Sequence, residues 1–241
     1  MRELKKVVAR PRTSEQLPFA FEHRASSGRD DLLISERMAA AVAMIDNWPA
    51  WPSPVVIITG PGGSGKSHLA DIWRQASGAL DIHPLAGAGA SEVAAASPVV
   101  FEDADRTGFD DTELFHVINS VKQNGQSLLM TARAWPLSWD VELADLKSRL
   151  RAATMVEIGE PDEGDLAQLI VKLFADRQLN IDDKIVDYIV PRMERSYGAV
   201  QAVVERIDTL ALARRTKVTR SIASEVISAL SDELAGDDLS Q

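Results

Sequence analysis

The segment from residue 55 to residue 68 constrains the fold more than any other part of the sequence. It begins with five β-branched residues, VVIIT, continues into a glycine-rich turn, and ends at the start of a helical pattern. The turn has the spacing G-x-x-x-x-G-K-[ST], in which glycines let successive backbone N–H groups point at phosphate oxygens. The lysine of such a loop reaches the β- and γ-phosphates, and its serine can ligate Mg²⁺. We therefore expect ADP or ATP, with Mg²⁺, at a loop formed by Gly60, Pro61, Gly62, Gly63, Ser64, Gly65, Lys66, Ser67 and His68.

Three further apolar runs have the character of strands that are buried on both faces of a parallel sheet. They cover residues 98–101, 127–131 and 154–158, and helical periodicity lies between the strands at 67–76 and 113–122. Strands that alternate with helices favour a three-layer αβα fold, so the sequence predicts an α/β core with a parallel sheet.

The character of the sequence divides the chain into four segments. Residues 1–30 are rich in Arg, Ser, Thr and Pro and are expected to form an extended arm, and residues 31–160 are expected to form the nucleotide-binding core. Residues 161–230 have helical periodicity without a strand signal, which predicts a small all-α lid. Residues 231–241 form an acidic tail. The helices expected in the lid cover 162–178, 182–193, 198–215 and 221–230.

Carboxylates follow the strand at 98–101, where enzymes with such a loop hold the Mg²⁺ shell and polarise the attacking water. The order of the pair puts Glu102 at the metal position and Asp103 at the catalytic one. Thr131 ends the next strand, where a hydroxyl can contact the γ-phosphate or the water. An exposed acidic turn, and a threonine that is simply common in strands, remain the alternatives.

Composition narrows the class of protein and of partner. The 241 residues include 26 basic and 36 acidic ones, for a formal net charge of −10, whereas proteins that grip DNA usually present a basic face. We therefore expect no strong direct DNA binding. The absence of cysteine excludes disulfides and Cys-ligated zinc. No apolar run is long enough for a membrane span, and none follows the basic N-terminus as in a secretory signal, so we expect a cytoplasmic protein without a membrane partner.

The expected arm contains one apolar island, in which Gln16 and Leu17 are followed by Phe19 and Phe21. This spacing resembles the Q-L-x-Φ-x-Φ peptide by which bacterial proteins dock onto the DNA polymerase sliding clamp. Burial of three such side chains contributes roughly 5–9 kcal/mol, and ordering six residues removes a similar amount. A few hydrogen bonds then leave a micromolar contact that suits transient recruitment. The alternative is an arm that folds back onto its own core.

The motifs together resemble those of the AAA+ ATPases and, within them, the DnaA family of bacterial replication initiators. The resemblance extends from about Phe19 to Leu230 and is carried by Gly60–His68, Phe101–Asp103, Thr131 in LLMTARAWP, and the SRL of Ser148–Leu150. It implies that Arg149 acts in trans as an arginine finger, which completes the nucleotide site of a neighbouring molecule. A surface arginine on an amphipathic helix is the alternative.

The chain ends where the lid ends, without the DNA-binding helix-turn-helix of the initiators, and in this it is similar to the Hda group of DnaA-related regulators. That resemblance implies two partners, the sliding clamp and DnaA, whose ATP hydrolysis the regulators trigger, and it leaves self-association open. One departure concerns the lid arginine that contacts the phosphates, because Gly198 stands at its position and Arg195 lies one helical turn earlier. This favours weak hydrolysis by the chain itself. The competing classes are an autonomous AAA+ ATPase, such as a helicase loader or remodeller, and a small-molecule kinase, for which we find no substrate site.

Overall fold

The structure is a computed structural model that describes residues 35–237, with side chains up to Glu233. The clamp-like residues Gln16, Leu17, Phe19 and Phe21 lie outside the described residues, as does the rest of the expected arm. The described chain begins with a short 3-10 helix, η2 (Glu36–Met38), which continues into α1 (Ala39–Asp46).

Five strands form one parallel sheet with the order β2-β3-β4-β1-β5. Their bounds are β1 Val55–Thr59, β2 Leu80–Asp81, β3 Val99–Phe101, β4 Leu128–Ala132 and β5 Thr154–Glu157. The four predicted strands are confirmed to within one residue at each end. The sequence did not predict β2, a two-residue edge strand with exposed side chains. Since β4 lies between β1 and β3, the carboxyl ends of these three strands meet at one edge of the sheet.

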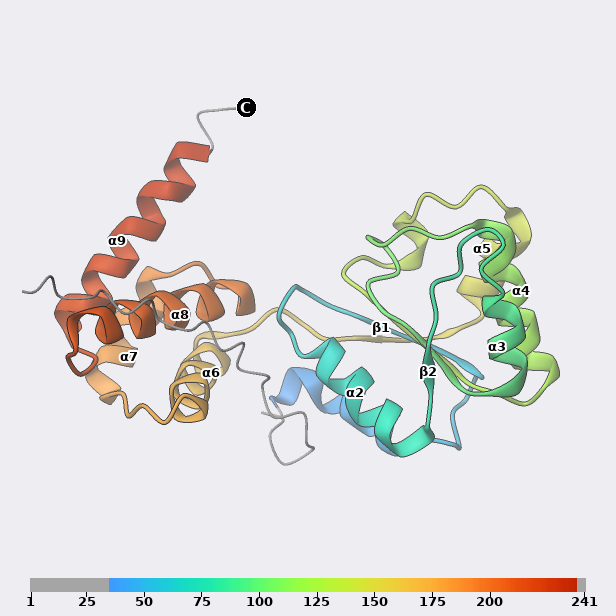
Figure 1. The fold of residues 1–241 in the computed structure, drawn as a ribbon, viewed down its shortest axis with the longest axis horizontal. Helices are drawn as coiled ribbons and strands as arrows, with labels where there is room; N and C mark the ends of the chain where they lie inside the picture. The colour runs from blue at the N-terminus through green and yellow to red at the C-terminus, as the bar shows by residue number, and fades with distance from the viewer. Residues whose placement is uncertain (1–34, 238–241) are drawn as a thin grey trace, which may run out of the picture.

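Helices cover both faces of the sheet, which confirms the predicted three-layer αβα core (Figure 1). One face is covered by α1 and α2 (Lys66–Ser77). The other is covered by α3 (Ala90–Ala96), α4 (Asp111–Gln123) and α5 (Ala144–Arg151). The alanine-rich α3 has no clear apolar periodicity, and for that reason the sequence did not predict it.

In the described chain after residue 160 all regular elements are helices, and they share a hydrophobic cluster of their own. Its elements are α6 (Glu163–Asp176), α7 (Asp183–Ile189), the 3-10 helix η4 (Val190–Arg192), α8 (Tyr197–Arg214) and α9 (Arg220–Asp237). The expected helix at 182–193 ends early as an α-helix because Pro191 has no N–H group to continue the ladder. Conversely, α9 continues beyond residue 230 into the segment expected to be a tail.

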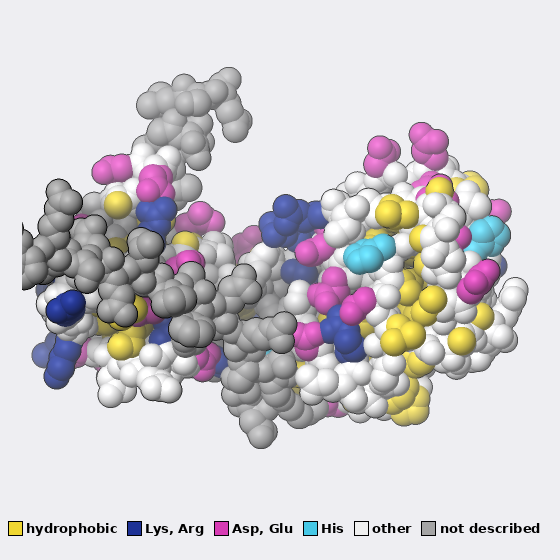
Figure 2. Space-filling view, viewed as in Figure 1, with side chains coloured by type: hydrophobic (Ala, Val, Ile, Leu, Met, Phe, Trp, Pro, Cys, Tyr) yellow, Lys and Arg dark blue, Asp and Glu magenta, His cyan; other side chains and the backbone are white. Residues whose placement is uncertain are grey.

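Acidic and basic side chains are interspersed over the described surface that Figure 2 shows, and no continuous basic area lies on that face. Within residues 35–237, no helix combines the length and the apolar character needed to cross a lipid bilayer.

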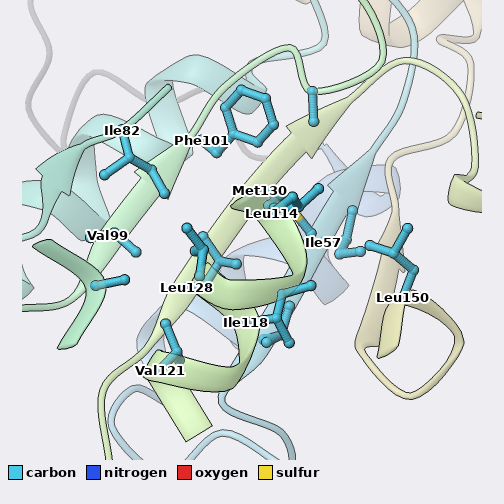
Figure 3. Packing of buried hydrophobic residues seen from close by; sticks show 14 of the residues in the cluster. Ile57, Ile82, Val99, Phe101, Leu114, Ile118, Val121, Leu128, Met130 and Leu150 are labelled. Carbon is cyan, nitrogen blue, oxygen red and sulfur yellow. The ribbon is translucent and has the colours of Figure 1, made fainter. Parts of the chain in front are cut away.

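Side chains of the central strands alternate between the two faces of the sheet, and both faces are buried. This explains why the central strands are continuous apolar runs. Val55 and Ile57 pack with α4 on one face, in the cluster that Figure 3 shows, and Val56 and Ile58 pack with α1 and α2 on the other. Every residue of β1, β3 and β4 is buried. Because both faces are covered by helices, no position in these strands is available to a polar side chain facing water.

Trp73 of α2 is the largest fully buried side chain, and it connects the helix layer to the segment after α1. Its ring stacks on Trp51 with centroids 5.0 Å apart and meets Trp48 edge-on at 6.2 Å.

We predict that Trp73→Ala lowers the free energy of unfolding by about 3–5 kcal/mol, since loss of the side chain leaves a large cavity. Urea denaturation followed by circular dichroism measures this. Trp135→Ala is the matched control, because Trp135 is 43% exposed and its loss should change stability much less.

Candidate functional site

A pocket of about 400 Å³ lies above the glycine-rich loop that joins β1 to α2. Loop residues Gly62 to His68 form its floor, and α6 and α8 of the lid form part of its wall. Asp103 and Arg133 enter from the ends of β3 and β4. The size is that of an ordinary small-molecule site.

Lys66 is buried at the base of the pocket, with 6% of its surface exposed. Its Nζ donates to the carbonyl oxygens of Gly60 and Pro61, at 2.8 Å each. Burial lowers the pKa of Lys66; the carboxylate of Asp103 opposes this shift, and the guanidinium of Arg133 adds to it. The loop carbonyls therefore orient the ammonium group, and the charges of Asp103 and Arg133 both act on it.

The loop continues directly into α2, which begins at Lys66 and is twelve residues long. Its first N–H groups have no partner within the helix and carry the positive end of the helix dipole. Ser67 lies in this first turn and lines the pocket. This arrangement favours an anion bound between the loop and the helix.

The two predicted carboxylates point to different surroundings. Asp103 lines the pocket, and its backbone has a left-handed φ of 49° that turns the chain at the end of β3. Glu102 does not line the pocket; it accepts a hydrogen bond from Arg74 Nη2 at 2.9 Å. The same guanidinium pairs with Asp71 and Asp81, so Glu102 belongs to an ion-pair cluster on the α2 side of the sheet.

Thr131 is buried and is not a lining residue of the pocket. Its hydroxyl oxygen accepts a hydrogen bond from the backbone N–H of Asp103 at 3.0 Å, and its carbonyl accepts one from Ala104 at 2.9 Å. In this structure the Thr131 hydroxyl therefore positions the backbone of Asp103 and does not itself line the pocket.

Sequence reasoning missed Asp105 and Arg133. Asp105 Oδ2 accepts hydrogen bonds from the backbone N–H groups of Arg133, at 2.9 Å, and Ala134, at 2.8 Å. Its Oδ1 is buried without a hydrogen-bond partner among the described residues. The available signals were the third acidic residue after the strand, two positions after Asp103, and a basic residue two positions after Thr131.

The lid contacts the loop through the first residues of α8. A Cβ at Gly63, which has a φ of +78°, would lie 3.0 Å from the Cβ of Tyr197 and 3.3 Å from the backbone nitrogen of Gly198. A side chain at Gly63 would therefore strain the backbone and require the first residues of α8 to shift slightly. Tyr197 is buried at the pocket, and this burial raises the pKa of its phenol. Arg195 is an exposed ion-pair partner of Glu163 and does not line the pocket.

Arg149 lies on α5, away from the pocket, with its guanidinium 6.0 Å from the ring centroid of Phe115. Within residues 35–237 it makes no hydrogen bond or ion pair with a carboxylate. The structure therefore does not bring Arg149 together with the loop of its own chain.

A magnesium ion would fit part of the predicted donor set. In the described part of the chain, no group of three or more His, Asp or Glu side chains could form a metal cage. Mg²⁺ bound with phosphates needs fewer protein ligands, usually one or two, with water completing the shell. Ser67 and Asp103 both line the pocket and meet that requirement, whereas Glu102 does not line it.

No family model and no curated protein matches this sequence. Solved structures do match the fold. Domain III of the replication initiation protein DnaA from Thermotoga maritima has a TM-score of 0.68 at 13% identity, over 83% of this chain and 95% of that one. The chain has the AAA+ fold.

Two other solved structures support the same conclusion. Replication initiator DnaA bound to AMPPCP and single-stranded DNA has a TM-score of 0.62 at 16% identity, over 77% of this chain. This chain spans 66% of that DnaA chain, less than two thirds of its length. The RuvB Holliday junction branch migration motor of Thermotoga maritima has a TM-score of 0.66 at 14% identity, over 86% of this chain and 72% of its own.

Arg37 connects the start of the core to the lid. It donates through Nε to Asp165 at 2.9 Å and through Nη2 to Asp162 at 3.0 Å. These two aspartates form the capping box of α6, in which each side chain accepts from the other's backbone N–H. The backbone N–H of Asp165, together with Arg37, holds the pKa of Asp162 below its ordinary value of 3.8.

We predict that Arg37→Ala loosens the lid and lowers the thermal unfolding temperature at neutral pH. A carboxyl with a depressed pKa stabilises the fold above its unfolded pKa, and this contribution is lost as the pH falls through the folded pKa. The difference between wild type and variant should therefore be constant above about pH 5 and shrink as the pH falls below 3.8. Arg195→Ala is the control, since its pair with Glu163 involves the same turn of α6 but no residue of the core. An equal effect of both variants would contradict the role of Arg37.

Proposed function

We propose that this chain is a nucleotide-bound regulator of DNA replication initiation, which docks on the DNA polymerase sliding clamp and stimulates ATP hydrolysis by DnaA. The observation that carries the proposal is that the chain has both a complete phosphate-binding loop and an arginine, Arg149, that lies away from that loop.

Nucleotide binding is supported by the loop and by the start of α2. Lys66 Nζ would exchange its contacts with the Gly60 and Pro61 carbonyls for phosphate oxygens, and the first amides of α2 would contact the β-phosphate. Ser67 and Asp103 would hold Mg²⁺, which neutralises charge on the phosphates when it is bound.

The action on DnaA is supported by the position of Arg149. A guanidinium is permanently charged and planar, so it can stabilise the charge that develops on a γ-phosphate. The aromatic face of Phe115 supports the side chain without neutralising it. Since Arg149 does not line the pocket of its own chain, we infer that its nucleotide belongs to a DnaA molecule. The same surface would also permit self-association.

Clamp docking rests on Gln16, Leu17, Phe19 and Phe21, which lie outside the described residues, and therefore on their sequence pattern alone. A micromolar contact is sufficient for this role, because a clamp on DNA and a DnaA molecule nearby would engage the chain at two sites together.

The second candidate is an autonomous AAA+ ATPase, such as a helicase loader or remodeller. One observation favours it: Asp103 and Ser67 line the same pocket, so a carboxylate is available beside the phosphates. Two observations favour weak hydrolysis instead. Glu102 is engaged by Arg74, and the lid presents the backbone of Gly198 to the loop rather than an arginine.

We predict that Lys66→Ala weakens ADP and ATP binding by about tenfold to a hundredfold, the effect of a lost charge-assisted hydrogen bond. Isothermal titration calorimetry with each nucleotide and Mg²⁺ measures this. Lys122→Ala removes the same charge from an exposed position on α4 and should bind as wild type does. If wild-type protein binds neither nucleotide, the proposal fails at its first step.

We predict that Arg149→Ala binds nucleotide normally but reduces hydrolysis by DnaA to the rate of DnaA alone, because a finger arginine accounts for a factor of about 10³ or more. The assay contains DnaA, ATP, the sliding clamp loaded on DNA and this protein. Arg151→Ala, on the same helix, should stimulate as wild type does.

The double variant Gln16→Ala with Leu17→Ala should lose both the stimulation of DnaA and the retention of the protein on immobilised clamp. Rapid turnover by the protein alone would instead favour the autonomous ATPase.

A further inference from the structure

We propose that Arg133 is a second phosphate-binding cation of the pocket, which contacts the terminal phosphate of a triphosphate bound in the same chain. The proposal rests on the nucleotide site proposed above and adds to it a residue that discriminates ATP from ADP. It is carried by the placement of one guanidinium group over the tip of the loop.

The guanidinium of Arg133 lies against Gly62. A Cβ at Gly62 would be 3.2 Å from the guanidinium carbon, 3.3 Å from Nη1 and 3.4 Å from Nη2. Because these distances are nearly equal, a face of the planar group covers the glycine. Its N–H edges are then directed away from Gly62, and the absence of a side chain at that position is what permits the approach.

Arg133 is also a cation without an anion. In the described part of the chain its side chain makes no hydrogen bond or ion pair, whereas Arg37, Arg74, Arg206 and Arg214 each have a carboxylate partner. Arg149 also has no carboxylate partner among the described residues, but it does not line the pocket. Lys172, the other cation of the wall, is paired with Asp176. Arg133 therefore keeps its donors available in a pocket that it shares with Lys66.

The surrounding charges favour an anion between the two cations. Arg133 is near enough to help burial lower the pKa of Lys66, so the positive charges repel each other. Asp103 and Asp105 oppose this effect. However, Asp105 Oδ2 is already occupied by two backbone N–H groups, and neither aspartate forms an ion pair with Arg133. A phosphate oxygen contacting Lys66 and Arg133 together would satisfy both.

The base of Arg133 is held in place. Its own backbone N–H and that of Ala134 are bonded to Asp105, directly after β4, which is paired to β1 over its full length. The side chain therefore starts from a fixed point at the sheet edge, and no movement of the lid is needed to bring it to the loop.

The position along the loop selects the phosphate. The amides at the start of α2 and the end of the loop cradle the α- and β-phosphates, and the lysine reaches the β- and γ-phosphates. Gly62 lies in the first half of the loop, ahead of the residues that enter α2, so a cation over Gly62 meets the terminal phosphate of a triphosphate. A diphosphate has no group there, and the contact distinguishes the two nucleotides.

The test compares affinities for ADP and for the non-hydrolysable analogue AMPPCP, with Mg²⁺, by calorimetry. We expect Arg133→Ala to weaken AMPPCP binding by about tenfold or more and ADP binding by less than about threefold, since one charge-assisted contact is lost only with the triphosphate. Arg133→Lys should recover part of the loss, because it restores the charge but not the planar donors. The side chain is exposed and unbonded, so the fold should be unchanged, which a thermal melt verifies.

Arg106→Ala is the matched control, because it removes an exposed arginine of the β3–α4 loop that does not line the pocket. Equal loss of both nucleotides in Arg133→Ala, or no loss of either, would overturn the assignment of Arg133 to the terminal phosphate. A loss of AMPPCP binding that Arg106→Ala reproduces would overturn it too, since the effect would then be that of net charge. Failure of wild-type protein to bind ADP and AMPPCP would refute the nucleotide site itself, which is a separate result.

Discussion

The parallel pairing of β4 with β1 on one side and β3 on the other is the constraint on which the rest of the site depends. Residue by residue, Val55–Thr59 pairs with Leu128–Ala132, and Val99 to Phe101 pairs with Leu128 to Met130. Because all three strands run the same way, the loop before α2, Asp103 and Arg133 emerge at one edge. Side chains from positions far apart in sequence therefore meet around Lys66 without any need for the lid to move.

The sequence predicted those features that depend on neighbouring residues. A β-branched run before a glycine-rich turn specifies a strand followed by a loop, because burial on both faces excludes polar residues and the turn requires residues without a Cβ. It could not predict partners that folding brings together. Arg74 and Glu102 are 28 residues apart and on different elements, and neither position alone indicates an ion pair. The metal-binding role assigned to Glu102 stays a prediction, whereas Asp103 is the carboxylate that lines the pocket.

Arg133 was missed for a related reason. The guanidinium of Arg133 can approach the loop because Gly62 has no side chain. In the sequence, however, a glycine of this loop is already explained by the need of the loop to wrap around phosphate. Only the strand order shows that the residue after β4 approaches that glycine. Tyr197 is similar, because its contact with Gly63 depends on how the lid sits on the core through Arg37 and the capping box of α6.

The two candidate functions differ in what the pocket does with a γ-phosphate. An autonomous ATPase needs a carboxylate, a positioned water and a cation that acts as the bond breaks, and it gains from a lid that responds to the terminal phosphate. Here the lid meets the loop through Tyr197 and the backbone of Gly198, which carry no positive side chain. Lys172, the lid cation that lines the pocket, is already paired with Asp176, so recognition of the γ-phosphate within this chain falls to the core, where Lys66 and Arg133 lie on elements fixed by the sheet. A rigid core contact can select a nucleotide without coupling its hydrolysis to lid movement. That combination agrees with the proposed regulator, in which the chain's own nucleotide would have a structural role and Arg149 would act on the nucleotide of a partner.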